Sequence, residues 1–200
     1  MRPILFAAAL AVGFGAIAQE PVYRWGPPAT NDFPERRIEQ LLALGDQGFV
    51  LLRASEDATT VKHFWLERYD SSLQFVGLTE IAFNNGVMGD AYFLDDVVVI
   101  NGALYAFVSH WEKAAGRHSL VLHPLGFDGV LQEGTQLDLV TAEKMGNRGF
   151  YKWSFSPDGK KLLLLTELPY VKDTKEKLRL SCFDLPGVQV AWKHEQTLEV

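Results

Sequence analysis

The chain has 200 residues, of which 48% are hydrophobic and 22% are charged. This composition is typical of a globular protein and excludes a disordered tail. The formal net charge is −6, with acidic and basic residues interspersed, so the sequence lacks the basic patch that nucleic-acid binding requires. Aromatic residues make up 12% of the chain, which favours strands over helices.

Residues 1–18 have the pattern of a signal peptide. Arg2 is followed by an uncharged apolar run from Ile4 to Ile17, and Ala16-Ile17-Ala18 supplies small residues before Gln19. The run is shorter than the ~20 residues of a membrane-spanning helix, although an N-terminal membrane anchor is the alternative. No later apolar stretch is long enough to span a membrane. We therefore expect an exported protein that is periplasmic, bound to the cell envelope or extracellular.

A single cysteine, Cys182, is present. One thiol cannot form an intrachain disulfide, and the same count excludes a cysteine cluster that binds metal. Because Cys182 lies within an apolar strand pattern, we expect it to be a small buried hydrophobic residue.

An internal repeat organises the rest of the chain. Gln47-Gly48, Asn101-Gly102 and Asp158-Gly159 are short-turn signals between apolar runs. Their glycines lie 54 and 57 residues apart, and Phe64, Leu120 and Leu178 recur at 56 and 58. Each repeat predicts four antiparallel strands: 38–44, 49–52, 64–66 and 75–81; 91–100, 104–108, 120–122 and 130–137; 150–155, 162–165, 178–180 and 188–198.

The strands differ in their predicted burial. Leu162 to Leu165 is apolar on both faces, as expected of a strand buried between two sheets. Val188, Val190 and Trp192 alternate with less apolar residues, as expected of a half-exposed outer strand. This gradient is typical of a β-propeller blade, whose inner strands are covered by radial stacking. We therefore predict an all-β, propeller-like fold, with a β-sandwich as the alternative.

The segment Trp153 to Leu163 contains Ser156-Pro157-Asp158-Gly159. It resembles the turn segment of WD40-like and TolB-type propellers and of the propeller domains of prolyl-oligopeptidase-like peptidases. The resemblance implies a turn between the first two strands of a blade, in which proline sets the entry φ and glycine accepts a positive φ. No Trp-Asp dipeptide ends any repeat.

The chain divides at these signals into a signal peptide, a leader and three repeats. Propellers have ~4–8 blades, so three repeats form an incomplete ring. We expect the remaining blades to be missing from this sequence; the alternative is a ring assembled from separate chains.

The leader contains Val22-Tyr23-Arg24-Trp25, which is a possible ring-closing strand. The predicted segments are residues 1–18, 19–36 and 37–200, with blades at roughly 37–83, 91–140 and 149–200.

The sequence contains none of the familiar catalytic motifs, so we assign no catalytic, cofactor-binding or metal-binding residue. His110 and His123 fall on neighbouring predicted strands and could share a metal ion, but without a third ligand we interpret them as histidines at strand ends. Asp95-Asp96 opens an apolar run, and 84–90 is a polar connection without the spacing of a calcium loop.

Five tryptophans could form a sugar-binding surface, but their strand-like positions favour packing. Trp111 lies beside His110 at the edge of a polar loop, so it is the one whose exposure should be checked. The five are Trp25, Trp65, Trp111, Trp153 and Trp192.

The sequence leaves three functions open. The first is an exported, non-catalytic propeller that binds or scaffolds a protein, peptide or glycan of unknown identity, with no nucleic-acid partner, no cofactor and no transmembrane segment once the signal peptide is removed. The alternative is the substrate-gating propeller of a larger secreted hydrolase that resembles prolyl-oligopeptidase-like peptidases. A weaker alternative is an enzyme whose metal ligands line the central channel.

Overall fold

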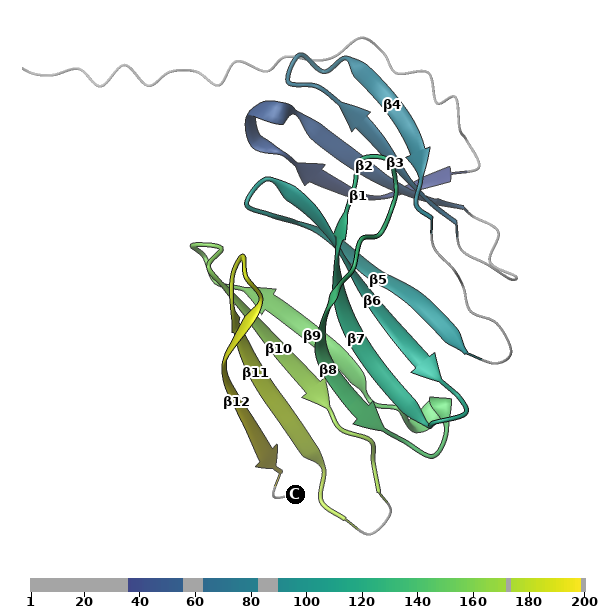
Figure 1. Cartoon of the computed structure of the whole chain (residues 1–200), viewed down its shortest axis with the longest axis vertical. Coiled ribbons are helices and arrows are strands. Elements are labelled where there is room, and N and C mark those ends of the chain that lie inside the picture. Colours follow the sequence, from purple (N-terminus) through teal and green to yellow (C-terminus); the bar gives the residue numbers. More distant parts are fainter. Residues whose placement is uncertain (1–35, 56–62, 83–89, 172–173, 199–200) are drawn as a thin grey trace, which may run out of the picture. The chain divides into compact units, whose positions relative to one another are not determined.

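The computed structural model describes residues 36–55, 63–82, 90–171 and 174–198. Within these ranges the chain forms three antiparallel sheets of four strands each, and each sheet is built from consecutive strands (Figure 1). The predicted signal peptide and residues 19–35 of the predicted leader lie outside the described residues. No helix among the described residues is long and apolar enough to span a membrane.

The first sheet begins two residues earlier than predicted. It comprises β1 (Arg36–Ala43), β2 (Phe49–Ser55), β3 (Phe64–Tyr69) and β4 (Phe75–Glu80). The turn between β1 and β2 is a short 3-10 helix, η1 (Gly45–Gln47), which ends at Gly48. Gly48 has a φ of 102°, and a Cβ atom there would lie 2.2 Å from the carbonyl oxygen of Tyr69. Glycine is therefore required at this predicted turn.

The second sheet contains the longest strands. It comprises β5 (Ala91–Ile100), β6 (Ala103–Glu112), β7 (Arg117–Leu125) and β8 (Thr135–Thr141). Asn101 and Gly102 both have positive φ, at 51° and 78°, so the predicted two-residue hairpin turn is confirmed.

The prediction for the last strand of this sheet, 130–137, is wrong by five residues at its start. Leu131 makes only an isolated bridge to Leu125, and Val130 makes one to Ala82 at the end of the first sheet. The chain folds back here because Gln132 N donates to the carbonyl oxygen of Pro124 at 2.9 Å. These local pairings place the apolar residues of 130–134 outside the sheet.

The third sheet carries the Ser-Pro-Asp-Gly segment as its first turn. A second 3-10 helix, η2 (Met145–Asn147), connects β8 to this sheet. Ser156 Oγ donates to Asp158 Oδ1 at 2.6 Å, and Gly159 has a φ of 67°, so the turn has the predicted chemistry. The strands are β9 (Phe150–Phe155), β10 (Lys161–Glu167), β11 (Lys177–Asp184) and β12 (Gln189–Thr197).

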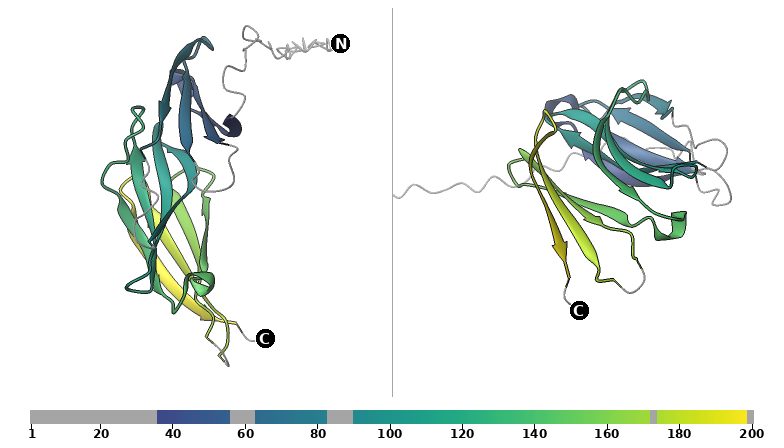
Figure 2. Two further views of the ribbon diagram at one scale, coloured as in Figure 1. Left: turned by 90° about the vertical axis from the view of Figure 1, so that its right-hand side faces the viewer. Right: turned by 60° about the horizontal axis from the view of Figure 1, so that its bottom comes forward.

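The three sheets stack in chain order through two apolar clusters. Leu52 and Val50 of the first sheet pack with Leu104 and Ala106 of the second. The other face of the second sheet contributes Phe107, Leu120 and Leu122, which pack with Leu162 and Leu164 of the third. Two such stacked interfaces confirm the predicted propeller-like arrangement of four-stranded sheets, which fan out in Figure 2.

The contacts between sheets define an inner and an outer edge. β1 contacts β5, and Trp153 of β9 hydrogen-bonds Asp96 of β5, so β1, β5 and β9 form the inner edge. Asp138 of β8 accepts a hydrogen bond from Lys193 of β12, which places β8 and β12 at the outer edge.

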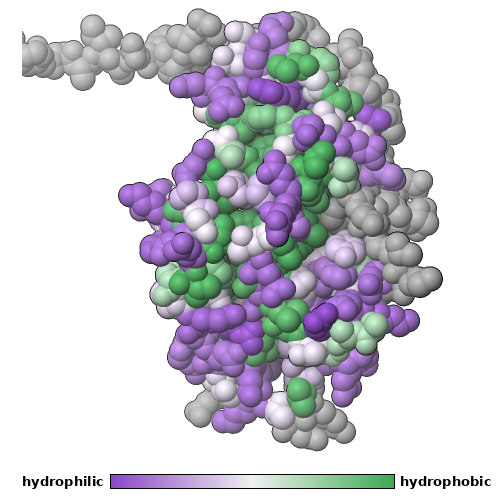
Figure 3. Space-filling model, viewed as in Figure 1, coloured by the Kyte–Doolittle hydropathy of each residue, from purple (hydrophilic) through white to green (hydrophobic). Residues whose placement is uncertain are grey.

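In the face shown in Figure 3, apolar side chains gather over the first and second sheets, whereas the lower part is mostly hydrophilic.

Two predictions of burial in the third sheet need correction. Leu162 and Leu164 are fully buried, but Leu163 is 39% exposed, because only one face of this sheet packs on another described sheet. In β12 all nine residues are exposed, so the predicted alternation does not give a half-buried strand. Val190 and Trp192 are both exposed.

Candidate functional site

Two hollows in the described part of the chain are the candidate sites. One, of about 690 Å³, lies at the end of the third sheet where β8 passes to β9 and β10 passes to β11. We call it the end hollow. The other, of about 300 Å³, lies at the inner edge between β1 and β5, and we call it the inner hollow.

The end hollow has a floor of strand residues and walls of loop residues. Phe150, Leu165 and Leu178 come from β9, β10 and β11. Glu167 at the end of β10 and Lys177 at the start of β11 also line it. The rest of the lining comes from the two connections and from the segment after β12: Met145, Gly146, Asn147, Arg148, Gly149, Leu168, Pro169, Tyr170, Val171, Thr174, Lys175, Glu176 and Leu198.

Side-chain hydrogen bonds hold the two walls of the end hollow in place. Asn147 Nδ2 donates to the carbonyl oxygen of Tyr170 at 2.6 Å and so joins one wall to the other. Arg148 Nη1 donates to the carbonyl oxygen of Met145 at 3.0 Å. Thr174 Oγ1 donates to the carbonyl oxygen of Val171 at 2.7 Å. The walls are therefore positioned by the chain itself, as in most preformed binding sites.

The lining of the end hollow combines exposed apolar side chains with polar and charged ones. Met145, Phe150, Tyr170 and Val171 all have exposed side chains. Glu167 pairs with Lys152 at 3.5 Å between Oε1 and Nζ, so this carboxylate is partly neutralised. A surface of this kind suits a bound peptide that places an apolar side chain in the hollow and keeps its polar backbone at the rim.

The inner hollow is lined by acidic and amide groups from two inner strands. Leu52, Phe64 and Leu94 supply its apolar walls, and Glu39, Gln40, Asp95 and Asp96 its polar groups. Each of the two inner strands has a register shift here, between Ile38 and Gln40 in β1 and between Leu94 and Asp96 in β5. The unpaired residues of these β-bulges are Glu39 and Asp95, so the irregularity turns two carboxylates toward the same space.

The two aspartates of the inner hollow differ in their partners. Burial raises the pKa of Asp95 despite hydrogen bonds from Ser109, and burial also raises the pKa of Asp96. Asp96 Oδ1 accepts from Val97 N at 2.8 Å and Oδ2 accepts from Trp153 Nε1 at 3.3 Å. Glu39 is paired with Arg37 at 2.7 Å. Of these contacts, the hydrogen bond from Trp153 joins two sheets, so Asp96 has a structural role at the stack.

The sequence held a signal for the inner hollow that motif searching missed. Glu39-Gln40 and Asp95-Asp96 are 56 residues apart, which is the repeat spacing. Equivalent positions of a stacked repeat face the same central space. The polar dipeptides Glu39-Gln40 and Asp95-Asp96 occupy equivalent positions of two repeats. A comparison of polar residues between repeats, in addition to turns and strands, would have identified the two bulges.

The candidate metal pair His110 and His123 is not brought together. In the β6–β7 ladder His110 is opposite Ser119 and His123 is opposite Ala106. The His110 ring stacks on Tyr92 with centroids 3.9 Å apart, and its Nε2 lies 4.0 Å from Asp90 Oδ2. His123 Nδ1 lies 2.8 Å from the carbonyl oxygen of Gln132. Among the described residues, no three histidine, cysteine or acidic side chains are grouped for metal binding.

The tryptophans divide into packed and exposed residues. Trp111 is only 3% exposed, so it is not available to a sugar, and the expected packing role is confirmed. Trp153 stacks on Phe107 at 4.2 Å, which confirms a packing role. Trp65 is half-buried under the Arg36 guanidinium at 4.2 Å. Trp192 is exposed, and Trp25 lies outside the described residues.

Of the polar connection before β5, residues 83–89 lie outside the described part. Asp90 is described, and its Oδ1 accepts from Lys113 N at 2.9 Å. Asp90 therefore fixes the β6–β7 turn.

Cys182 is buried, as predicted.

A buried histidine between the second and third sheets was not singled out from the sequence. His118 is almost fully buried, and its Nδ1 lies 3.3 Å from the carbonyl oxygen of Arg148. The Tyr151 ring lies tilted beside the His118 ring, with centroids 4.8 Å apart, and its hydroxyl donates to the carbonyl oxygen of His118 at 2.7 Å. Burial lowers the pKa of His118 to about 4. This histidine is therefore neutral at pH 7.

No protein-family model matches the chain, and no curated protein matches it. Among solved structures, the chain is similar to one described as "Structure of Dos1 propeller", with a TM-score of 0.47, 12% sequence identity and coverage of 80% of this chain. The propeller-like fold of this chain rests on its three stacked four-stranded sheets. The chain spans 37% of that propeller chain.

Proposed function

We propose that this protein is an exported, propeller-like binding module that holds an extended peptide segment of a partner protein in the end hollow. The observation that carries the proposal is the end hollow itself, a preformed space of about 690 Å³ between two connections that are joined by the Asn147–Tyr170 hydrogen bond. Export is supported by the charged, apolar and small-residue pattern of residues 1–18.

A peptide suits the end hollow better than a glycan does. Its exposed side chains include Met145, Phe150 and Val171, which offer apolar contact and few hydrogen bonds. Methionine and aromatic side chains are enriched where peptide side chains are bound. Trp111, one of the tryptophans considered for sugar binding, is buried. A glycan bound against these apolar side chains would lose hydrogen bonds from its hydroxyl groups to water.

The charged rim is mixed in sign. Lys177 lies beside Glu176, and Glu167 is paired with Lys152. Such a rim gives no strong preference for acidic or basic peptides, so selectivity comes from the apolar side chain that enters the hollow.

Selection from a displayed random-peptide library against the full chain tests the proposal. We expect the selected peptides to carry an apolar anchor residue, and Tyr170→Ser and Met145→Ser to weaken their binding by at least about tenfold. Phe75→Ser, at an exposed aromatic residue of β4, is the matched control and leaves binding unchanged. Peptides that bind the wild type and both hollow variants equally would contradict the proposal.

Export is tested separately. The full chain is expressed in a bacterial host, and the N-terminus of the extracytoplasmic product is sequenced. We expect the product to begin at Gln19. Retention of the uncleaved chain in the cytoplasm would exclude export while leaving the peptide site to its own test.

A further inference from the structure

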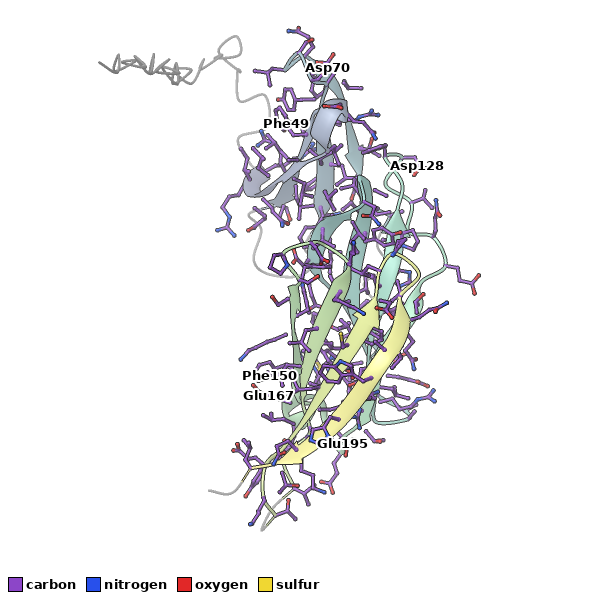
Figure 4. The ribbon with its side chains drawn as sticks, turned by 90° about the vertical axis from the view of Figure 1, so that its left-hand side faces the viewer. Phe49, Asp70, Asp128, Phe150, Glu167 and Glu195 are labelled. Atoms are coloured by element: carbon purple, nitrogen blue, oxygen red, sulfur yellow. The ribbon has the colours of Figure 1, made fainter. Side chains whose placement is uncertain are left out.

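A buried histidine of the second sheet contacts one wall of the end hollow. We call residues 145–149, which line the hollow between β8 and β9, the β8–β9 wall. The Nδ1 atom of His118 lies 3.3 Å from the carbonyl oxygen of Arg148 in this wall. β9 begins directly after the wall at Phe150, which Figure 4 shows beside Glu167 at the end of the third sheet. The wall is therefore held by the second sheet on one side and joined to the third sheet on the other.

Three strands enclose the His118 ring. It is almost fully buried, and in the strand ladders it lies opposite Trp111 of β6 and Val140 of β8, which are also buried. Tyr151 of β9 lies against the ring and donates its hydroxyl to the backbone of the same histidine. The ring therefore has almost no contact with water while the wall is in place.

The hydrogen bonding around this ring has room for one proton only. A carbonyl oxygen only accepts, so Nδ1 carries the proton of the neutral ring and donates it to Arg148. Nε2 then presents a bare lone pair, which is buried and has no hydrogen-bond partner among the described residues. A second proton would enter on Nε2 without an acceptor. Burying such an unpaired charge is strongly unfavourable.

The cations near His118 also oppose its protonation. Burial is the main cause of its low pKa of about 4, and the Arg148 cation and the neighbouring His110 lower the pKa further, although the hydrogen bond to the Arg148 backbone raises it. Arg117, the preceding residue of β7, is paired with Glu112. The histidine is therefore neutral at pH 7 in the closed structure.

The other titratable groups of this boundary do not compensate a charge on His118. Tyr151 stays neutral, because burial raises the pKa of its hydroxyl. Two carboxylates lie near Tyr151, but both have other partners. Asp95 of β5 is hydrogen-bonded by Ser109, and Asp138 of β8 by three donors of the third sheet.

We propose that protonation of His118 releases the β8–β9 wall from the second sheet, so that acid opens the end hollow and frees its peptide. The effect on the peptide rests on the function proposed above, whereas release of the wall needs no ligand. The wall is the part that moves, because β7 is paired on both sides, by β6 and β8. The wall itself has only the single turn η2, which is too short to be stable without the contacts that hold it.

Proton linkage sets the direction and the size of the response. In the released state the ring reaches water and has the pKa of an unperturbed histidine, 6.5, against about 4 in the closed state. The released state therefore binds the proton more tightly, and acid favours it. With these two pKa values, the ratio of released to closed wall rises by about 20-fold between pH 7 and pH 5.

Amide hydrogen exchange of the full chain at pH 7 and pH 5, corrected for the intrinsic pH dependence of exchange, measures the release. The reporters are the amides of Asn147 and Arg148, which donate within the β8–β9 connection at 3.0 and 3.3 Å. We expect their protection to fall by about 20-fold from pH 7 to pH 5 in the wild type. In His118→Gln, whose side chain can donate to Arg148 but gains no charge, we expect no such fall. His123→Gln is the matched control and follows the wild type.

An amide of the first sheet separates local release from unfolding of the whole chain. Ile81 N donates to the carbonyl oxygen of Phe64 at 2.9 Å, and we expect it to be better protected than the wall at both pH values. Equal protection of Ile81 and the wall would overturn the proposal, because only global unfolding would then expose His118. Wall protection that does not change with pH in the wild type also overturns it, even if His118→Gln fails to fold.

The dissociation rate of a peptide selected on the full chain at pH 7 tests the consequence for binding. We expect dissociation to be about 20-fold faster at pH 5 than at pH 7 for the wild type, and His118→Gln to lack this acceleration. If the wall is released in acid but dissociation is not accelerated, the wall does not regulate the site and the proposal is wrong. If no selected peptide depends on the end hollow, the proposed function fails, and the exchange measurement still decides whether His118 releases the wall.

Discussion

Trp153 Nε1 donates a hydrogen bond to Asp96 Oδ2 at 3.3 Å, across the boundary between the third and second sheets. The two residues are 57 positions apart, which is one repeat. The indole also stacks on Phe107 of the second sheet at 4.2 Å with an interplanar angle of 14°. The tryptophan that begins the Ser-Pro-Asp-Gly segment therefore joins one repeat to the one before it at the inner edge.

Replacing this tryptophan tests the boundary. Trp153→Phe keeps an aromatic ring against Phe107 but removes the donor to the half-buried Asp96. Leaving a buried acceptor unpaired costs about 1–3 kcal/mol, so we expect the free energy of unfolding in urea to fall by about that amount. Trp192→Phe, at an exposed tryptophan of β12, is the control and changes it by less than about 0.5 kcal/mol. Equal effects of the two substitutions would contradict a role for the Asp96 hydrogen bond.

Asp138 is the corresponding contact at the outer edge. Its buried carboxylate accepts from Thr166 Oγ1 at 2.5 Å, Arg179 Nη1 at 2.9 Å and Lys193 Nζ at 2.9 Å, all from the third sheet. Burial alone would raise the pKa of Asp138, but the hydrogen bonds from Thr166 and Lys193 and the nearby cations outweigh burial and hold the pKa below its usual value. The stabilisation is therefore present above the unfolded pKa near 3.8 and is lost as the pH falls through the lower pKa of the folded state.

We expect Asp138→Asn to lower the free energy of unfolding at pH 7 by about 3–5 kcal/mol, because it leaves Arg179 without its buried partner. Glu195→Gln removes the exposed partner of the same Arg179 and is the matched control, with an expected loss of at most about 1 kcal/mol. Denaturant titration measures both. A loss from Asp138→Asn no larger than that from Glu195→Gln would show that burial adds nothing to this contact.

His118 makes the boundary between the second and third sheets sensitive to acid. Its pKa is about 4 in the folded chain, against 6.5 for an unperturbed histidine. Because the unfolded chain binds the proton more tightly, this histidine destabilises the fold as the pH falls from about 6.5 to about 4. A shift of this size corresponds to roughly 3 kcal/mol. We expect His118→Gln, which has no charge to gain, to lose less stability than the wild type between pH 7 and pH 4.

The raised pKa values of Asp95 and Asp96 act in the opposite direction, since protonation of these carboxyls favours the folded chain as the pH falls. The comparison of wild type with His118→Gln cancels their contribution. His123→Gln, at a histidine for which no such burial exists, is the control and should follow the wild type. If the three proteins lose stability in parallel, His118 does not carry the acid response.

The strands were predictable because turns and apolar periods are local. Ala91–Ile100 and Phe150–Phe155 have the predicted bounds. The start of β8 was not predictable, because Val130 and Leu131 are as apolar as strand residues and only their pairing with other segments removes them from the sheet. The end hollow was missed for a similar reason: its lining comes from two connections that meet only in three dimensions. The bulges at Glu39 and Asp95 also depend on pairing, although their repeat spacing was visible.

Gly149 tests whether the end hollow depends on the geometry of the β8–β9 connection. It has a φ of 71°, and a Cβ atom there would lie 2.0 Å from the backbone oxygen of Glu167. Gly149→Ala therefore combines an unfavourable φ with a clash against backbone, and we expect it to lower the free energy of unfolding by more than about 1 kcal/mol. It should also weaken peptide binding, because Arg148 and Phe150 on either side line the hollow. Gly146→Ala is the matched control in the same connection: a Cβ atom there meets nothing within 4 Å, so stability and binding should both be retained. If Gly149→Ala loses stability yet binds selected peptides as the wild type does, the peptide site lies elsewhere.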